Sequence, residues 1–213
     1  MIALLKKDAI LMAKHFSLIY IVPILFPMIV VIQNPQFFPV VVTMALSLAF
    51  ALQPLTTINF DEKSNWQRML STMPLIGKYE VISKFLLSLI IALTSSVLIM
   101  LLLIIASYFP VIDFELNLFF FFAGMGFTMS LAYNMIVIPA AYKFGTMKCR
   151  YVLLIFIFTP VLAVNLANFF GLEFDMRLPD LPVLVYIVLW LITLMSLLFI
   201  SIFISIKIRS KKS

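Results

Sequence analysis

Few side chains in this sequence have the types and spacing that bond-making chemistry requires. The chain holds a single histidine, His15, and a single cysteine, Cys149, which excludes an intrachain disulfide and a metal site built from several cysteines. Its five glycines form no GxxxxGK[ST] sequence, so the chain lacks the loop that cradles nucleotide phosphates. We therefore expect no catalytic residue, no metal site and no cofactor bound by this chain.

The most distinctive polar segment runs from residue 60 to residue 84. Ser64 and Gln67 have the spacing of a helix capping box, and Pro74 ends the segment that they begin. Four apolar residues recur at the i, i+3, i+4 and i+7 positions of one helix face: Trp66, Met69, Leu70 and Met73. A helix this short is marginal alone, so we expect it to lie either on the membrane or in a groove of a partner protein.

Residues 142–150 form a second charged segment. Its basic side chains are Lys143, Lys148 and Arg150. Membrane topology alone explains such a segment, and a second docking point for a partner is the alternative reading.

The long apolar stretches contain neutral polar groups but no aspartate, glutamate, lysine or arginine. Most such groups join helices to one another, whereas three asparagines are candidates for lining a substrate cavity: Asn134, Asn165 and Asn168. A carrier driven by protons or sodium needs an acidic relay inside the membrane, so the sequence disfavours that class. Gly124 and Gly126 predict a close approach between helices.

The composition of the whole chain is that of a membrane protein. Of 213 residues, 64% are hydrophobic and 11% are charged, and the mean hydropathy is +1.19. A soluble domain is about half apolar and about a quarter charged. We predict an all-α integral membrane protein with one domain over residues 1–213 and no nucleotide-binding domain. The net charge of +6 lies beside apolar segments, which indicates membrane lipid rather than nucleic acid as a partner.

Stretches without charged residues predict six transmembrane helices. Residues 15–60 are free of charge over 46 positions, which is enough for two spans separated by the polar residues 33–36. Four further charge-free stretches each hold one helix. The predicted spans are 16–32, 38–59, 85–109, 116–141, 151–170 and 182–206.

The basic residues predict the orientation of these spans. If both termini are cytoplasmic, the inner side carries 14 of the 15 lysines and arginines, and the outer side carries only Arg177. Positive charge accumulates on the cytoplasmic side of membrane proteins. We therefore expect a multi-pass protein of the bacterial plasma membrane with both termini in the cytoplasm.

Residues 1–15 predict an amphipathic helix at the membrane interface, before the first span. One face of the helical wheel would hold Ile2, Leu5, Ala9, Met12 and Phe16. The opposite face would hold Lys6, Lys7, Asp8, Lys14 and His15. The alternative is that the helix of the first span simply extends into the cytoplasm.

The polar segments resemble those of ABC-2 type transporter permeases. Residues 61–74, DEKSNWQRMLSTMP, resemble that family's loop between spans two and three, with its acidic residue, short tryptophan-containing helix and final proline. Residues 78–84, KYEVISK, resemble the entry into span three. Residues 139–145 and 148–150, PAAYKFG and KCR, resemble the loop between spans four and five.

This resemblance implies a permease that catalyses no bond chemistry itself. Two permeases, identical or different, would pair, and two separate cytosolic ABC ATPase subunits would hold ATP and magnesium beneath them. Asn65–Met73 would be the coupling helix and Met1–Ala13 the connecting helix. The residues expected to couple the permease to the ATPase are Asp61, Glu62, Ser64, Trp66, Gln67, Met69, Leu70, Met73, Lys143 and Lys148.

Two functions from different classes fit the sequence. The first is the permease subunit of an ABC exporter that moves amphipathic, antimicrobial or cytolytic peptides. The second is an immunity or assembly protein of the membrane that sequesters toxic peptides without an ATPase. Many ABC-2 relatives have a larger outer segment where this chain has only residues 171–181, so the resemblance does not fix the form of an outer gate.

Overall fold

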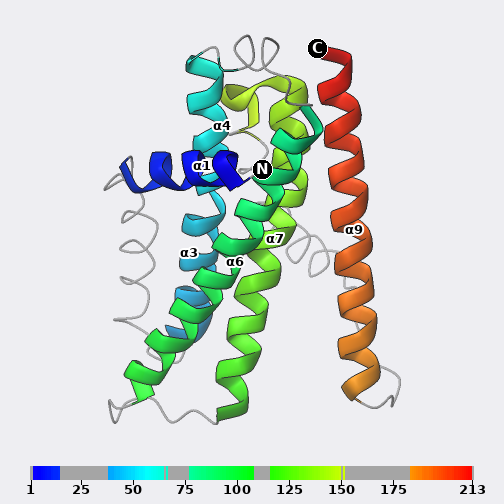
Figure 1. The fold of residues 1–213 in the computed structure, drawn as a ribbon. Helices are drawn as coiled ribbons and strands as arrows, with labels where there is room; N and C mark the ends of the chain where they lie inside the picture. The colour runs from blue at the N-terminus through cyan, green and yellow to red at the C-terminus, as the bar shows by residue number, and fades with distance from the viewer. Residues whose placement is uncertain are drawn as a thin grey trace, which may run out of the picture.

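The computed structural model describes residues 2–14, 38–64, 66, 77–107, 116–149, 151 and 183–212. These residues are helical apart from short turns and include no strand, which confirms the all-α prediction (Figure 1). The helices are α1 (Ile2–Lys14), α3 (Phe38–Ala51), α4 (Gln53–Lys63), α6 (Gly77–Ser107), α7 (Leu116–Phe144) and α9 (Val183–Lys212).

Four helical segments are long and apolar enough to cross a membrane. They are Phe38–Lys63, Gly77–Ser107, Leu118–Phe144 and Val188–Ser210. These segments correspond to the second, third, fourth and sixth predicted spans. The predicted span 16–32, and all of the predicted span 151–170 except its first residue, lie outside the described residues, so the count of six stays a prediction.

The helices extend beyond the predicted ends of the spans. Helix α6 begins at Gly77 rather than at Phe85, and α9 ends at Lys212 rather than at Ile206. Charged residues mark the point where hydropathy falls, but lysine, arginine and glutamate are good helix formers. The helical backbone hydrogen bonds therefore continue beyond the charged residues that were used to place the ends of the spans.

A proline interrupts the first described span without ending it. Pro54 lies at the start of α4, where a missing backbone N–H is tolerated. Around it the Leu52 N–H still donates to the Leu48 carbonyl at 3.2 Å, and the Thr56 N–H donates to the Leu52 carbonyl at 3.2 Å. Helices α3 and α4 consequently form one spanning segment.

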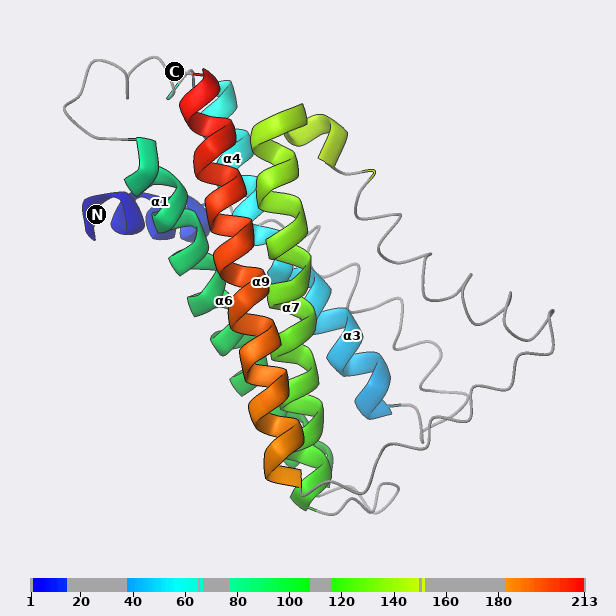
Figure 2. The ribbon, with the colours of Figure 1, turned by 90° about the vertical axis from the view of Figure 1, so that its right-hand side faces the viewer.

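Helices α3, α6 and α7 form the packed centre of the bundle (Figures 1 and 2). Val42 and Leu46 of α3 are buried against Ile99 and Leu103 of α6 and against Phe119 of α7. These contacts are between aliphatic and aromatic side chains in close packing, which is what holds helices together where lipid replaces water.

Gly126 of α7 lies close to side chains of both α3 and α6. A Cβ atom at Gly126 would collide with the Ile99 side chain of α6 and would come within 3.4 Å of the Thr43 methyl group of α3. This confirms the predicted close approach at Gly126. At Gly124 a Cβ atom would meet nothing within 4 Å, so this glycine is not needed for packing between the described helices.

Helix α9 lies along one side of the bundle, against α6 and α7 (Figure 2). It buries a narrow stripe, Ser201, Ser205 and Arg209, whose four-residue spacing places them on one face. The Ser201 hydroxyl donates to the Met135 carbonyl of α7 at 2.6 Å. Most of the remaining described side chains of α9 are exposed and apolar, which is suited to lipid.

Helix α1 lies across the other helices rather than along them (Figure 1). A helix is present where the sequence predicts one, and its position at the membrane interface stays a prediction. The predicted place of Asp8 on the water-facing side of this helix is wrong, because Leu4 and Asp8 are buried against the bundle. A helical wheel assigns Asp8 to water, whereas the structure pairs it with Lys84 of α6.

Candidate functional site: a buried charge network at one end of the bundle

Five charged side chains among the described residues are buried at the end of the bundle where α4 ends and α6 begins. They are Asp8, Asp61, Glu80, Lys84 and Arg209. We call this end the charged end. Lysine, arginine, aspartate and glutamate are almost never fully buried unless they are paired, so their partners define the site.

Lys84 is the centre of the network. Its side chain is 1% exposed, and its ammonium lies 2.8 Å from Asp8 Oδ1 of α1 and 2.6 Å from Asp61 Oδ2 of α4. The same ammonium donates to the Thr57 hydroxyl at 3.1 Å. One cation on α6 therefore holds α1 and the end of α4 in place.

Lys7 of α1 is a second cation in the network, and it also contacts Trp66. Its ammonium lies 2.6 Å from Asp61 Oδ1 and 3.3 Å from Asp8 Oδ1. It also stands 4.2 Å from the centroid of the Trp66 ring, which is within the range of a cation–π contact. Two lysines and two aspartates thus balance in charge and connect α1, α4, α6 and Trp66.

A second buried pair joins α6 to α9. The Arg209 Nε donates to Glu80 Oε2 at 3.0 Å, and both side chains are almost fully buried. Glu80 lies one helical turn before Lys84 on α6, so both pairs stand on the same stretch of that helix. Ion pairs at the charged end consequently join α1, α4, α6 and α9.

Glu62 connects the end of α4 to the turn that follows α7. Gly145 ends α7 with a φ of +86°, a conformation that favours glycine, and its N–H donates to the Ala141 carbonyl at 2.9 Å. Thr146 then donates its backbone N–H at 3.1 Å and its hydroxyl at 2.5 Å to Glu62 Oε2. Burial, together with the nearby Glu62 charge, raises the pKa of the Cys149 thiol to about 11.

The structure connects two of the predicted coupling residues, Asp61 and Trp66, through Lys7, whereas Glu62 contacts Thr146. Ser64 is exposed at the end of α4, where its hydroxyl donates to the Asp61 carbonyl at 3.4 Å. Lys143 and Lys148 are exposed, and the Lys143 ammonium lies 5.0 Å from the centroid of the Phe144 ring. The other predicted coupling residues lie outside the described residues: Gln67, Met69, Leu70 and Met73.

Of the asparagines proposed to line a cavity, only Asn134 is described. It is buried in α7, and its amide donates to the Ser130 carbonyl at 3.0 Å. Asn165 and Asn168 lie outside the described residues, so their role stays a prediction.

The pairing of Asp8 with Lys84 was not predicted from the sequence. Charges outside the charge-free stretches were expected to be solvated. A signal was present, because the only acid among the basic residues near the N-terminus is Asp8, and Lys84 directly precedes an apolar span. Opposite charges at such positions are candidates for pairing once the helices pack.

The family of the chain follows from its similarity to a known protein family. A family model described as ABC-2 family transporter protein matches residues 3–209, which is nearly the whole chain. The chain belongs to the ABC-2 transporter family. No curated protein and no solved structure matches it. As an ABC-2 family chain with four described helices able to cross a membrane, it is a multi-pass membrane protein of a transport system.

Proposed function

We propose that this chain is the permease subunit of an ABC exporter whose ATP hydrolysis is carried out by separate cytosolic ATPase subunits. Membership of the ABC-2 family supports the permease role. The sequence has no phosphate-binding loop, so ATP has to be bound by another chain. The one-sided distribution of basic residues supports a bacterial plasma-membrane protein with both termini, and the charged end, in the cytoplasm.

The charge network is the observation that carries the proposal. The Trp66 ring contacts Lys7, and Lys7 and Lys84 share the carboxylate of Asp61. Separating one partner of a buried ion pair costs about 3–5 kcal/mol. A displacement of Trp66 is therefore transmitted to α1, α4 and α6 together rather than lost in local sliding.

This arrangement supports a mechanism of coupled motion. Closure of an ATPase dimer beneath the membrane would press on residues 65–73, and α1 with the two attached spans would move as one unit. The permease would then exchange inward-open and outward-open states, with the ATPase cycle setting their populations. A second permease, identical or different, would supply the other half of the pathway.

We further propose amphipathic cytolytic peptides as the cargo. Exposed apolar side chains cover the described part of α9, including Trp190, Phe199 and Phe203, so an amphipathic molecule can approach it from the bilayer. The sequence also resembles the smaller permease of the staphylococcal exporter of phenol-soluble modulins, which are amphipathic peptide toxins. The buried acids Asp8, Asp61 and Glu80 all have cationic partners, which favours a structural role over an ion relay.

The experiment is co-purification of the tagged chain with its ATPase from native membranes. Trp66→Asp removes the ring beneath Lys7 and adds a negative charge, so we expect the ATPase to be lost from the complex while the permease stays in the membrane. Trp66→Phe keeps an aromatic ring and is the matched control, which we expect to retain the ATPase. Substrate-stimulated ATP hydrolysis is measured on each purified complex.

Two results would count against the coupling role. Undiminished complex and undiminished ATP hydrolysis with Trp66→Asp would place the ATPase contact elsewhere. Protection against toxic peptides in cells that lack every ATPase partner would favour an immunity protein over an exporter.

A further inference from the structure

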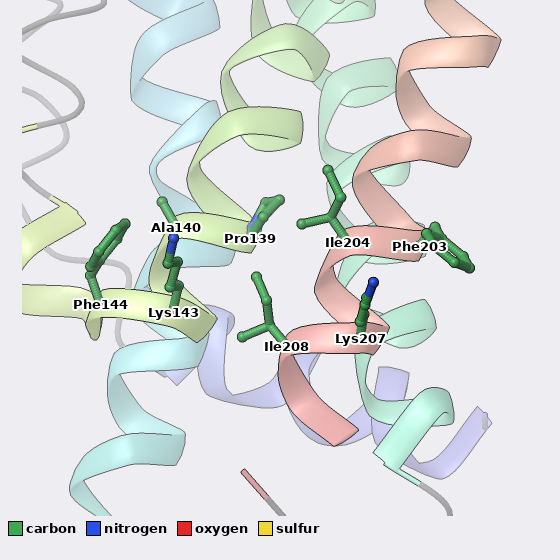
Figure 3. A pocket seen from close by; sticks show the side chains of 8 residues that line it. All are labelled: Pro139, Ala140, Lys143, Phe144, Phe203, Ile204, Lys207 and Ile208. Carbon is green, nitrogen blue, oxygen red and sulfur yellow. The ribbon is translucent and has the colours of Figure 1, made fainter. Parts of the chain in front are cut away.

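An open groove of about 670 Å³ lies between the last turn of α7 and the C-terminal part of α9 (Figure 3). Apolar side chains make up most of its wall, with Pro139 on α7 and Ile204 and Ile208 on α9. Its charged side chains are Lys143 and Lys207, one from each helix. The described residues that line the groove include no carboxylate.

The two lysines run along the groove rather than away from it. Figure 3 shows Lys143 reaching back towards Ala140, and Lys207 reaching back towards the turn that holds Phe203 and Ile204. The Lys207 side chain is exposed, and its ammonium has no ion pair within the described part of the chain. Ammonium groups beside apolar surface near a membrane edge are suited to an anion that lies there with them.

Apolar surface continues from the groove along both helices. Ile136 and Ile200 lie one helical turn further from the charged end, and they are 49% and 55% exposed. Their four-residue spacing from Ala140 and Ile204 places them on the same helix faces. A ligand with a charged headgroup between the lysines could thus place a long apolar tail against these residues.

We propose that this groove binds one anionic phospholipid from the leaflet at the charged end. The headgroup phosphate lies between Lys143 and Lys207, and an acyl chain lies along Ile204, Ile200 and Ile136. Basic pockets between transmembrane helices recognise anionic headgroups in this way. A second copy of this chain fits less well, because two-fold pairing at this face would bring lysines together. This proposal is independent of the ATPase and of the exported cargo.

The test is lipid binding to the purified full chain in a neutral detergent, measured by native mass spectrometry. Dioleoyl phosphatidylglycerol is the anionic probe, and dioleoyl phosphatidylcholine is the neutral probe. We expect phosphatidylglycerol to bind about five-fold more weakly to Lys207→Gln and about 30-fold more weakly to Lys143→Gln/Lys207→Gln, from the usual contribution of each lysine near an anionic lipid. Phosphatidylcholine binding stays unchanged in both variants.

The matched control is Lys6→Gln/Lys78→Gln, which removes two exposed charges from the charged end away from the groove. It should bind phosphatidylglycerol as the unmodified chain does. Ala140→Phe fills the groove without changing charge and should also abolish this site. A melting temperature equal to that of the unmodified chain shows that each variant is folded.

Three results would overturn the proposal. The first is undiminished phosphatidylglycerol binding by the double lysine variant. The second is full displacement of phosphatidylglycerol by inorganic phosphate, which would reduce the groove to a site for any anion. The third is a change of oligomeric state in the double lysine variant without a change in lipid binding, which would assign the groove to a second copy of the chain.

Discussion

Removal of the Lys84 ammonium should lower the free energy of unfolding more than removal of an exposed lysine does. Lys84→Met keeps the aliphatic chain but leaves two buried carboxylates to share the single ammonium of Lys7. That ammonium is 2.6 Å from Asp61 and 3.3 Å from Asp8, so it retains part of the pairing. We therefore expect the lower end of the usual cost of breaking a buried pair, about 3 kcal/mol.

For a chain of this length, such a loss lowers the melting temperature by roughly 6–12 °C. Differential scanning fluorimetry of the purified protein in detergent measures it. Lys78→Met is the matched control, because Lys78 is exposed on the same helix and its replacement should stay within about 0.5 kcal/mol.

The balance of charges in the network also predicts the stability of a double variant. Asp8→Asn combined with Lys84→Met leaves one lysine and one aspartate, so the double variant should recover at least half of the lost stability. The reasoning is refuted if Lys84→Met melts within about 2 °C of Lys78→Met, or if the double variant is less stable than the single one.

Three other perturbations have defined outcomes. Gly126→Ala should be less stable than Gly124→Ala by about 1–3 kcal/mol in the same melting assay, since both gain helix propensity but only the first collides with a neighbour. Arg209→Met should lower the melting temperature by leaving Glu80 buried without its cation, and adding Glu80→Gln should restore it; no recovery would contradict the pairing. Cys149, with a pKa near 11, should react slowly with maleimide at pH 7.5 and faster as pH rises towards 11, and rapid labelling at pH 7.5 in the folded protein would argue against burial.

The raised pKa of Cys149 also predicts how the stability of the fold changes at alkaline pH. The folded state holds the Cys149 proton more tightly than the unfolded chain, whose thiol has an ordinary pKa of 9.0. The contribution of the protonated thiol to the free energy of unfolding is fully present below pH 9 and is lost as pH rises from 9 towards 11. Cys149→Ser should reduce this alkaline loss.

Long-range pairing is what the sequence could not predict. Hydropathy identified the helical class and four described spans, because lipid demands about 20 consecutive apolar residues whatever their neighbours are. The helix at the N-terminus was also predictable from its pattern. Its orientation was not, because the wheel ranks Asp8 by its affinity for water and takes no account of Lys84, which is 76 residues away.

The candidate site was predictable only in part. Asp61, Glu62 and Trp66 could be selected from a local motif, since the motif is contiguous in sequence. Their contacts are with Lys7, Lys84 and Thr146, which come from three other segments. Contacts of this kind depend on how helices pack, and a single sequence contains no direct record of packing.

The most direct test of the central claim is peptide transport by purified components. Inside-out proteoliposomes that contain the permease, its partner permease and the ATPase should accumulate a fluorescent amphipathic peptide when ATP is added outside. Accumulation should disappear without the ATPase, without ATP, or with Trp66→Asp, and should persist with Trp66→Phe. Peptide accumulation that is the same with and without the ATPase would contradict the account.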